Sequence, residues 1–473
     1  MKIRFLVVLA FAAIVFTGNA QTVFQDEVKV LLQKPEYRNA TVGIVIADAK
    51  TGERLFELNP DQLMIPASTL KIVTTATALE MLGADYRFET KTGFTGAIDE
   101  TGTLHGDLVI VSGGDPTLGS AWFNTSKCKN WFLKDWVEQI IHSGIKEIKG
   151  NVVLDGSLYH IEEVPPTWVW GDIGNYYGAN ASAFTVYDNL FTITFRSGKA
   201  GEKTEIIQLE PNLSDLKIDN RVLSSEINSD QAYVFGSPMD NNRIIRGTIP
   251  KEKKAFSIKA SIPNSAALLG VELLSVLKAE GIKIGGTVVQ DSVENVKIIH
   301  VHQSPTLTEI VKTVNHESVN LFAEHLLLQL SAEKTGVGSR EKSIELVQQF
   351  WNEKGFNVSS LFMEDGSGLS HFNAISPAFI TSVLVDMKSS KNSVSFVESL
   401  PNAGEGTLSS FSTQKFPGNT LSVKSGSMTR VRCYAGYLKT SSGKEIAFSI
   451  MFNHFSGSQS KLRAGIENLL STL

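Results

Sequence analysis

The segment Pro66–Gly83, "PASTLKIVTTATALEMLG", contains a serine and a lysine three residues apart, Ser68 and Lys71. Residues i and i+3 share one face of a helix, so the lysine amine can lie beside the serine hydroxyl. A neutral amine can accept the serine proton, although an unperturbed lysine has a pKa of about 10.4. Burial and the positive end of a helix would both disfavour the charged form of Lys71. The pair is compatible with a nucleophile and its base, but the same spacing recurs elsewhere, for example at Ser214 and Lys217.

Two further short motifs follow in the last third of the chain. Ser318 and Asn320 form a Ser-x-Asn motif, in which the hydroxyl can relay a proton and the amide can hold a substrate carbonyl or the lysine. Lys424, Ser425 and Gly426 lie in the strand-like stretch "LSVKSGS". Glycine there removes a side chain where a substrate backbone must approach. Three literal Lys-Thr-Gly matches do not begin the closing sheet, and we set them aside: those at Lys50, Lys91 and Lys334.

The elements around these motifs come from the two ends of the chain. Two strand-like runs, residues 42–47 and 54–58, predict a hairpin ahead of a helix that begins near Pro66 and ends at Leu82. Helical patterning returns from Ser304, three adjacent strands follow Leu421, and a helix is expected at 459–470. We therefore expect the two ends of the chain, residues 21–84 and 300–473, to form one domain.

The segment between these two parts predicts two smaller inserted domains. Residues 131–157 and 266–292 share a helical pattern, a "GIK" turn, a glycine, a "VV" strand and an aspartate close to a serine. We assign these similar units to inserted domain II, 85–183 and 255–299. The polar, strand-rich stretch 184–254 is expected to form inserted domain III.

Composition limits the classes of function. The 473 residues are 42% hydrophobic and 20% charged, as in ordinary globular proteins. Residues 1–20, with Lys2, Arg4, an apolar run and small residues up to Ala20, predict a cleaved signal peptide and export to the periplasm. A net charge of −5 without a basic cluster argues against nucleic-acid binding. Cys128 and Cys433 form no disulfide framework, and the histidines, such as His302, show no metal-ligand spacing, so we expect no metal and no cofactor.

In order, Ser-x-x-Lys, Ser-x-Asn and Lys-Thr/Ser-Gly form the set used by penicillin-binding proteins and class A β-lactamases. Ser68 and Ser318 are about 250 residues apart, whereas those β-lactamases leave no room for such an insert. Together with "GDLVIVSGGDPTL", "DGSGLSHFNAIS" and "LPNAGEGTL", this spacing resembles the low-molecular-weight class C penicillin-binding proteins. These are the serine peptidase S13 family of D-alanyl-D-alanine carboxypeptidases/endopeptidases, and the resemblance covers essentially the whole mature chain.

The resemblance implies an α/β, transpeptidase-like domain, with an antiparallel sheet flanked by helices, that is interrupted by two smaller inserted domains. It also implies that the protein acts on peptidoglycan peptides and is inhibited by β-lactam antibiotics. It implies Ser68 as nucleophile, Lys71 as base, and Ser318 and Asn320 as proton relay and substrate holder. Lys424 and Ser425, beside Gly426, would bind a terminal carboxylate, and the N–H groups of Ser68 and Ser427 would form an oxyanion hole. The resemblance also matches Asp155 to the position in the insert that contacts a diaminopimelate amino group in the family.

Two departures from the family pattern are visible: Val319 stands where aspartate is common, and Ser425 replaces threonine but keeps a hydroxyl. Two other functions remain open at this point, a β-lactamase and a non-catalytic wall-binding protein. The balance of carboxypeptidase and endopeptidase work and the oligomeric state also stay open.

Overall fold

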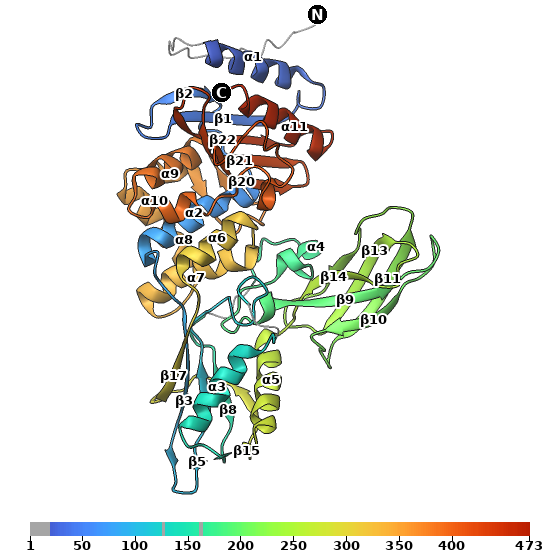
Figure 1. The fold of residues 1–473 in the computed structure, drawn as a ribbon, viewed down its shortest axis with the longest axis vertical. Coiled ribbons are helices and arrows are strands. Elements are labelled where there is room, and N and C mark those ends of the chain that lie inside the picture. Colours follow the sequence, from blue (N-terminus) through green and yellow to red (C-terminus); the bar gives the residue numbers. More distant parts are fainter. Residues whose placement is uncertain (1–18, 125–127, 160–163) are drawn as a thin grey trace, which may run out of the picture.

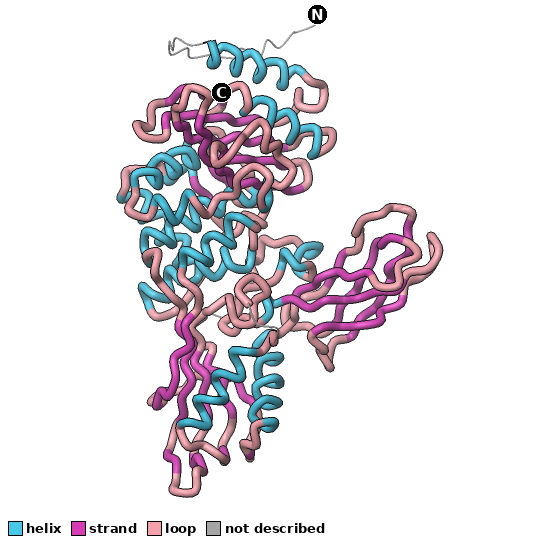
Figure 2. Tube along the Cα trace, in the orientation of Figure 1, coloured by secondary structure: helices cyan, strands magenta, loops and turns pink. Residues whose placement is uncertain are grey.

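The computed structural model describes residues 19–124, 128–159 and 164–473, and shows an elongated molecule with a side arm (Figure 1). Helices α1 and α11 lie at one end, and the middle of the chain forms the other end and the arm (Figure 2). The predicted leader, 1–20, falls almost wholly outside the described residues. None of the helices described is long and apolar enough to cross a membrane.

One five-stranded antiparallel sheet joins the two ends of the chain, in the order β2-β1-β22-β21-β20. The predicted hairpin is present as β1 and β2, and the three predicted closing strands are β20, β21 and β22. The bounds are β1 (Thr41–Asp48), β2 (Arg54–Leu58), β20 (Leu421–Met428), β21 (Val431–Lys439) and β22 (Glu445–Asn453).

Both faces of this sheet are covered, which explains why its central strands are almost continuously buried. Along β22, Phe448 and Ile450 point into one hydrophobic cluster, whereas Ala447 and Met451 belong to another. The first cluster includes residues of α1 (Asn19–Gln33) and α11 (Gln459–Leu470), which contact each other. The second includes residues of the other helices that pack on this sheet or beside it: α2 (Lys71–Leu82), α6 (Leu307–His316), α7 (Asn320–Thr335), α8 (Arg340–Glu353), α9 (Pro377–Ser389) and α10 (Ser393–Val397). A small hairpin, β18 (Leu361–Phe362) with β19 (Ala374–Ile375), links α8 to α9.

The segment that carries Ser68 differs from the prediction. A 3₁₀ helix, η1 (Ala67–Leu70), comes first, and the α-helix α2 begins only at Lys71. Ala67 has a positive φ of 47°, and the Thr69 hydroxyl donates to the Pro66 carbonyl at 2.7 Å. These local features hold a tighter turn in place of the first α-helical turn.

The middle of the chain builds a second body, which we call the insert body. It contains a five-stranded sheet, a four-stranded sheet, and two helices that contact each other, α3 (Trp131–His142) and α5 (Ser265–Ala279). The two similar units predicted from the sequence lie side by side, because β8 pairs with β16 and β7 pairs with β15, both in parallel. The larger sheet has the order β16 (Val288–Gln290), β8 (Val152–Asp155), β6 (Leu108–Val111), β3 (Glu89–Phe94), β17 (Lys297–Gln303). The smaller has the order β15 (Lys283–Ile284), β7 (Glu147–Ile148), β5 (Thr103–His105), β4 (Ala97–Ile98).

The arm consists of two three-stranded sheets (Figure 1). One has the order β10 (Glu205–Glu210), β9 (Leu190–Arg196), β14 (Phe256–Ser261). The other has the order β11 (Lys217–Ser225), β13 (Asn242–Pro250), β12 (Tyr233–Phe235). Strand β14 lies in the range predicted for domain II, yet it pairs with β9 of the arm. One hydrophobic cluster runs through the arm and the insert body, and the short helix α4 (Trp170–Ile173) contacts β12 of the arm.

Candidate active site

Ser68 and Lys71 lie side by side at the start of α2. Side chains at i and i+3 of a 3₁₀ turn eclipse each other, and Lys71 Nζ lies 3.0 Å from Ser68 Oγ. The Lys71 side chain is fully buried, while Ser68 is only half-buried. The hydroxyl therefore faces accessible space, and the amine behind it is withdrawn from water.

Two more oxygens surround the Lys71 amine. Nζ lies 2.6 Å from Asn320 Oδ1 and 2.6 Å from the carbonyl oxygen of Ser367. Asn320 is the first residue of α7, and its Nδ2 donates to the carbonyl of Tyr177, in the insert, at 2.8 Å. The amide of Asn320 thus bridges the lysine and the insert.

The second lysine, Lys424, is also fully buried and lies on β20. Its Nζ donates to Ser318 Oγ at 2.9 Å and to the carbonyl of Ser425 at 3.0 Å. Ser318 lies between α6 and α7 with a positive φ of 63°, a conformation that is uncommon for a residue with a side chain. The structure thus brings together Ser68, Lys71, Ser318, Asn320 and Lys424, which we call the serine–lysine cluster.

Strand β20 presents a free edge beside Ser68 from Lys424 onward, beyond Ser422, which forms a bridge with Asn402. It is the last strand of its sheet, and the Val423 N–H donates away from β21, to Pro401, at 3.0 Å. Because backbone groups alternate along a strand, the N–H groups of Ser425 and Ser427 point to the same side. A Cβ on Gly426 would lie 2.6 Å from the Pro66 carbonyl and 3.0 Å from the Ser68 nitrogen. Only glycine lets the strand pass this close to η1.

Burial lowers the pKa of both lysines. It brings the pKa of Lys71 to about 7, although the nearby carboxylates of Asp365 and Glu324 oppose the shift. The pKa of Lys424 is lowered well below its usual value, first by burial and then by the charges of Lys71 and Arg432. Lys71 can thus exchange a proton near neutral pH.

Three groups near Lys71 were not predicted from the sequence: the Glu324 and Asp365 carboxyl groups and the Ser367 carbonyl. Glu324 lies one helical turn after Asn320, is buried, and accepts the N–H of Ser367 at 2.8 Å. Burial and the charge of Asp365 raise the pKa of Glu324 to about 7. The Asp365 carboxylate accepts the N–H of Gly368 at 2.7 Å and the Trp168 indole N–H at 2.8 Å. The spacing Asn320–Glu324 and the "DGSG" stretch were the available signals for these groups.

Asp155 is placed differently from the other predicted residues. It ends β8 in the insert body, and its carboxylate accepts the N–H groups of Ser157 and Val293, each at 3.0 Å. None of its described hydrogen bonds goes to the serine–lysine cluster. Ser425 is buried beside Lys424, and Ser427 is exposed at the end of the free edge.

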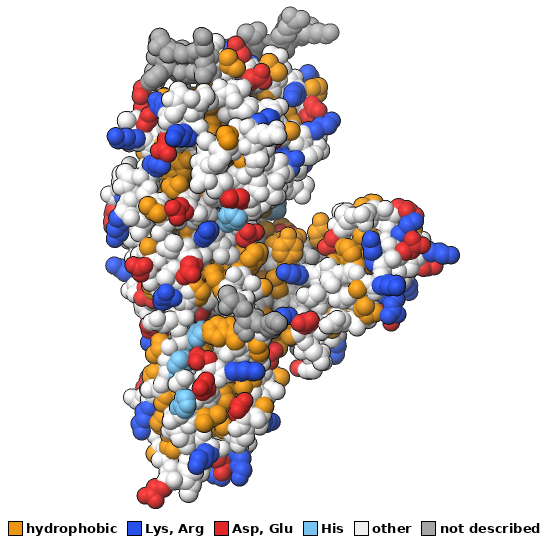
Figure 3. Space-filling model, viewed as in Figure 1, with side chains coloured by type: hydrophobic (Ala, Val, Ile, Leu, Met, Phe, Trp, Pro, Cys, Tyr) orange, Lys and Arg blue, Asp and Glu red, His pale blue; other side chains and the backbone are white. Residues whose placement is uncertain are grey.

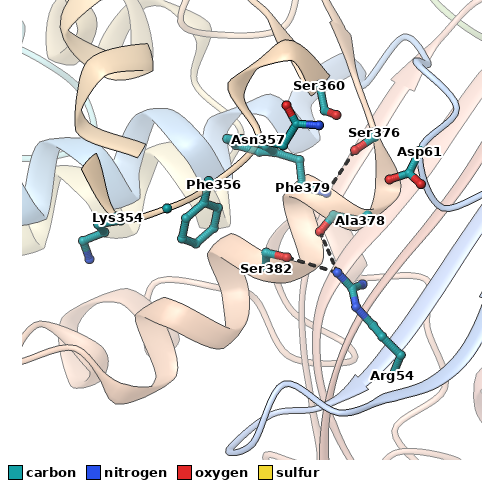
Figure 4. A pocket seen from close by; sticks show the side chains of 11 residues that line it. Arg54, Asp61, Lys354, Phe356, Asn357, Ser360, Ser376, Ala378, Phe379 and Ser382 are labelled. Atoms are coloured by element: carbon teal, nitrogen blue, oxygen red, sulfur yellow. Dashed lines mark hydrogen bonds between the residues drawn. The ribbon is translucent and has the colours of Figure 1, made fainter. Parts of the chain in front are cut away.

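A cavity of about 330 Å³ lies elsewhere on the same domain, between β2 and α9 (Figure 4). Arg54 reaches into it, and its Nη2 donates to Ser382 Oγ at 3.1 Å and to the Ala378 carbonyl at 3.5 Å. None of the predicted site residues lines this cavity. We therefore take the serine–lysine cluster, and not this cavity, as the candidate active site.

The family model of the D-Ala-D-Ala carboxypeptidase 3 (S13) family matches residues 24–473. The chain belongs to this family. The resemblance predicted from the three motifs is thereby confirmed. Among curated S13 relatives, the D-alanyl-D-alanine carboxypeptidase of Actinomadura sp. (strain R39) is 27% identical over 458 residues, covering 93% of this chain and 83% of the relative. D-alanyl-D-alanine carboxypeptidase DacB of Haemophilus influenzae is 25% identical over 438 residues, covering 90% and 88%.

The S13 fold is also supported by a solved structure. Penicillin binding protein 4 (dacB) from Haemophilus influenzae superposes with a TM-score of 0.80 at 24% identity, covering 94% of this chain and 97% of the other. The predicted fold class is therefore confirmed for the S13 chain described here.

Proposed function

We propose that this protein is a serine-type D-alanyl-D-alanine carboxypeptidase and/or DD-endopeptidase that acts on peptidoglycan stem peptides. The observation that carries the proposal is the position of Lys71 Nζ, 3.0 Å from the Ser68 hydroxyl and held by Asn320 and Ser367. Family membership and relatives named as D-alanyl-D-alanine carboxypeptidases support the substrate class. The predicted leader supports export to the periplasm, where this substrate lies.

In the proposed first step, Ser68 Oγ attacks the carbonyl carbon of the penultimate D-Ala while neutral Lys71 takes the serine proton. The negative charge that develops on the carbonyl oxygen is stabilised by the N–H groups of Ser68 and Ser427, a contribution typically of about 3 kcal/mol. The free edge of β20 lets an extended peptide add as a further strand, which aligns its carbonyl with Ser68.

Collapse of the tetrahedral intermediate breaks the peptide bond and releases the terminal D-Ala amine. The proton that Lys71 took from Ser68 passes to that amine through the Ser318 hydroxyl, which is hydrogen bonded to Lys424, while Asn320 holds the substrate amide. Lys424 and Ser425 bind the terminal carboxylate by charge-assisted hydrogen bonds. Water then hydrolyses the Ser68 ester and restores the enzyme.

The insert contributes to the proposed site as well as to substrate choice. The Tyr177 carbonyl holds Asn320, and the Trp168 indole holds Asp365. We keep the proposed division into 21–84 with 300–473, 85–183 with 255–299, and 184–254. The pairing of β14 with β9 favours a boundary for the strand-rich part that lies beyond residue 254.

An amino group on the stem peptide has two candidate partners. Asp155 was predicted for this role, but both of its carboxylate oxygens already accept backbone N–H groups. Asp172 of α4 accepts the Tyr177 hydroxyl at 3.3 Å, and Tyr177 is the residue whose carbonyl holds Asn320. Hydrophobic side chains gather where the arm meets the main body near α4 (Figure 3), and Trp170 and Tyr176 are exposed there. Asp172 is thus the better placed carboxylate for an amine at this end of the site.

The proposal is tested by labelling with a fluorescent penicillin and by measuring D-Ala release from a pentapeptide ending in D-Ala-D-Ala. We expect a stable penicillin adduct at Ser68 and the release of one D-Ala for each pentapeptide cleaved. Both should be absent in Ser68→Ala. Fast penicillin turnover without D-Ala release would identify a β-lactamase instead. A protein that binds peptidoglycan but neither labels nor releases D-Ala would be a wall-binding protein. Product masses after digestion of purified peptidoglycan separate carboxypeptidase from endopeptidase action.

A further inference from the structure

Three side chains with metal-binding atoms converge in the insert body, apart from the serine–lysine cluster. Asp135 of α3 faces His300 and His302 of β17, and one ligand atom of each lies within 4.8 Å of the other two. His300 Nε2 is 3.2 Å from Asp135 Oδ2, and His302 Nδ1 is 3.8 Å from the same oxygen. In the part of the chain that the structure describes, no other histidine, cysteine, aspartate and glutamate side chains converge in this way.

The local structure fixes these ligands on rigid elements. Alternate residues of a strand point to the same face, so His300 and His302 both face α3, which packs on β17. The His302 ring lies between Trp131 and Trp136, with centroid distances of 5.5 and 6.1 Å, and only 8% of the residue is exposed. The indole rings therefore hold His302 at the convergence point.

The hydrogen bonding of this group is incomplete. His300 Nε2 is shielded from solvent and makes no hydrogen bond in the described structure, despite its short distance to Asp135. A second His–Asp pair in the same insert body behaves differently: His105 Nε2 and Asp99 Oδ2 form an ordinary hydrogen bond at 2.8 Å on the surface. A buried nitrogen without a partner calls for an explanation that the exposed pair does not need.

We propose that Asp135, His300 and His302 bind one divalent transition-metal ion, with Zn²⁺ as the best fit. Two imidazoles and one carboxylate suit zinc and disfavour magnesium and calcium, which prefer oxygen ligands only. Ligand atoms about 2.0–2.1 Å from a tetrahedral zinc lie about 3.4 Å apart, so small side-chain adjustments bring these three atoms into place. The fourth position is left to water. Such an ion would tie α3 to the edge strand β17 of the insert body.

The test uses the full mature chain after treatment with a chelator, titrated with Zn²⁺ by calorimetry and with Co²⁺ by visible absorption. We expect one ion per chain, the intense visible bands of four-coordinate Co²⁺, and a Zn²⁺-dependent rise in Tm. His300→Ala and Asp135→Asn each remove one ligand from a partly exposed position. Because even the outer partners of a metal ligand are worth about 10- to 100-fold in affinity, each variant should weaken Zn²⁺ binding at least tenfold.

His105→Ala is the matched control, since it removes a His–Asp pair without a second histidine, and it should bind Zn²⁺ like the unchanged chain. The proposal is overturned if the unchanged chain takes up no ion, or if His105→Ala loses as much affinity as His300→Ala. Two folded ligand variants that bind Zn²⁺ normally would overturn it too. Penicillin labelling of Ser68 should survive chelation, so this result and the test of the proposed function remain independent.

Discussion

Lys71 and Lys424 are both fully buried in the serine–lysine cluster, yet the charged groups near Lys71 are acidic and those near Lys424 are basic. Lys71 has the carboxylates of Glu324 and Asp365 nearby, which partly offset the cost of burial and leave its pKa at about 7. Lys424 has cations nearby, Lys71 and Arg432, which add to the effect of burial. Two residues of one type, in one site, thus have pKa values that are shifted by neighbouring charges of opposite sign.

The difference matches the two tasks that we propose. A base must lose and regain its proton during each turnover, and a pKa near the working pH serves both steps. A carboxylate-binding lysine instead meets an anion when the substrate arrives, and that anion favours the charged form. Binding of the substrate carboxylate should therefore raise the pKa of Lys424, whereas the pKa of Lys71 is set before the substrate arrives.

Replacing Lys71 should have the largest effect and tests its proposed role as the base. Lys71→Arg keeps a cation but removes a group that can deprotonate, so the rate of acylation should fall about 10²- to 10⁴-fold. The measurement is the rate of labelling by a fluorescent penicillin, with thermal unfolding as a check on folding. Lys354→Arg, a lysine–arginine exchange at a surface salt bridge, serves as control and should label normally. Labelling of Lys71→Arg at the original rate would place the base elsewhere.

Lys424→Ala should produce the next largest effect and separates the two lysines by substrate. Loss of a hydrogen-bonded charge typically costs about 1.5–3 kcal/mol, so cleavage of a pentapeptide ending in a free carboxylate should fall roughly 10- to 150-fold. An analogue with an amidated terminus should be poor for the unchanged enzyme and should lose less from the mutation. Four rates decide the matter, two enzymes on two substrates. Equal losses on acid and amide would mean that Lys424 does not bind the carboxylate.

The site residues that could be predicted from the sequence are those whose side chains are proposed to take part in the chemistry. Ser68, Lys71, Ser318, Asn320 and Lys424 could be selected because few residue types carry this chemistry and their order along the elements is distinctive. Strands β21 and β22 were likewise predictable, since a sheet covered on both faces requires nearly continuous apolar runs. The fold class followed from these strands and the returning helices.

The remaining parts of the site depend on backbone groups and long-range packing, which leave little trace in a sequence. Any residue type offers the carbonyl that Ser367 or Tyr177 supplies, so no pattern marks either one. The 3₁₀ turn at Ser68 depends on the positive φ of Ala67, a conformation that alanine rarely adopts. Strand β14 joins β9 across more than fifty residues of the arm, and local patterning cannot specify such a partner.

Glu324→Gln tests whether neighbouring charge accounts for the difference between the two lysines, because it removes an acidic group near Lys71, and Lys424 has basic neighbours. The Glu324 carboxylate raises the pKa of Lys71, so its removal should lower that pKa further. Acylation requires neutral Lys71 and rises with pH through this pKa. The acid limb of the pH–rate profile should therefore move to lower pH, with the largest, severalfold gain around neutral pH, where Glu324, with its pKa of about 7, carries a charge in the unchanged enzyme. Glu272→Gln, a carboxyl of raised pKa that is hydrogen bonded to Tyr187 in the insert, should leave the profile unchanged. A shift to higher pH in Glu324→Gln would contradict the proposed electrostatics.

The smallest effect is expected at the carboxylate of Asp172, which hydrogen bonds to Tyr177 and to neither lysine of the site. If this group binds the amine of a diaminopimelate-type side chain, Asp172→Asn should raise KM severalfold for a stem peptide carrying that amine, because an ion pair at this half-buried carboxylate, still reached by solvent, should be worth about 1 kcal/mol. A peptide with the amine acetylated should show no such change, and kcat should hold for both, since Asp172 does not touch the reacting atoms. Asp155→Asn is the matched comparison: its carboxylate accepts two backbone N–H groups, so the change should lower Tm and leave the two peptides equally affected. If Asp155→Asn no longer distinguished the two peptides while Asp172→Asn still did, the amine-binding role would return to Asp155.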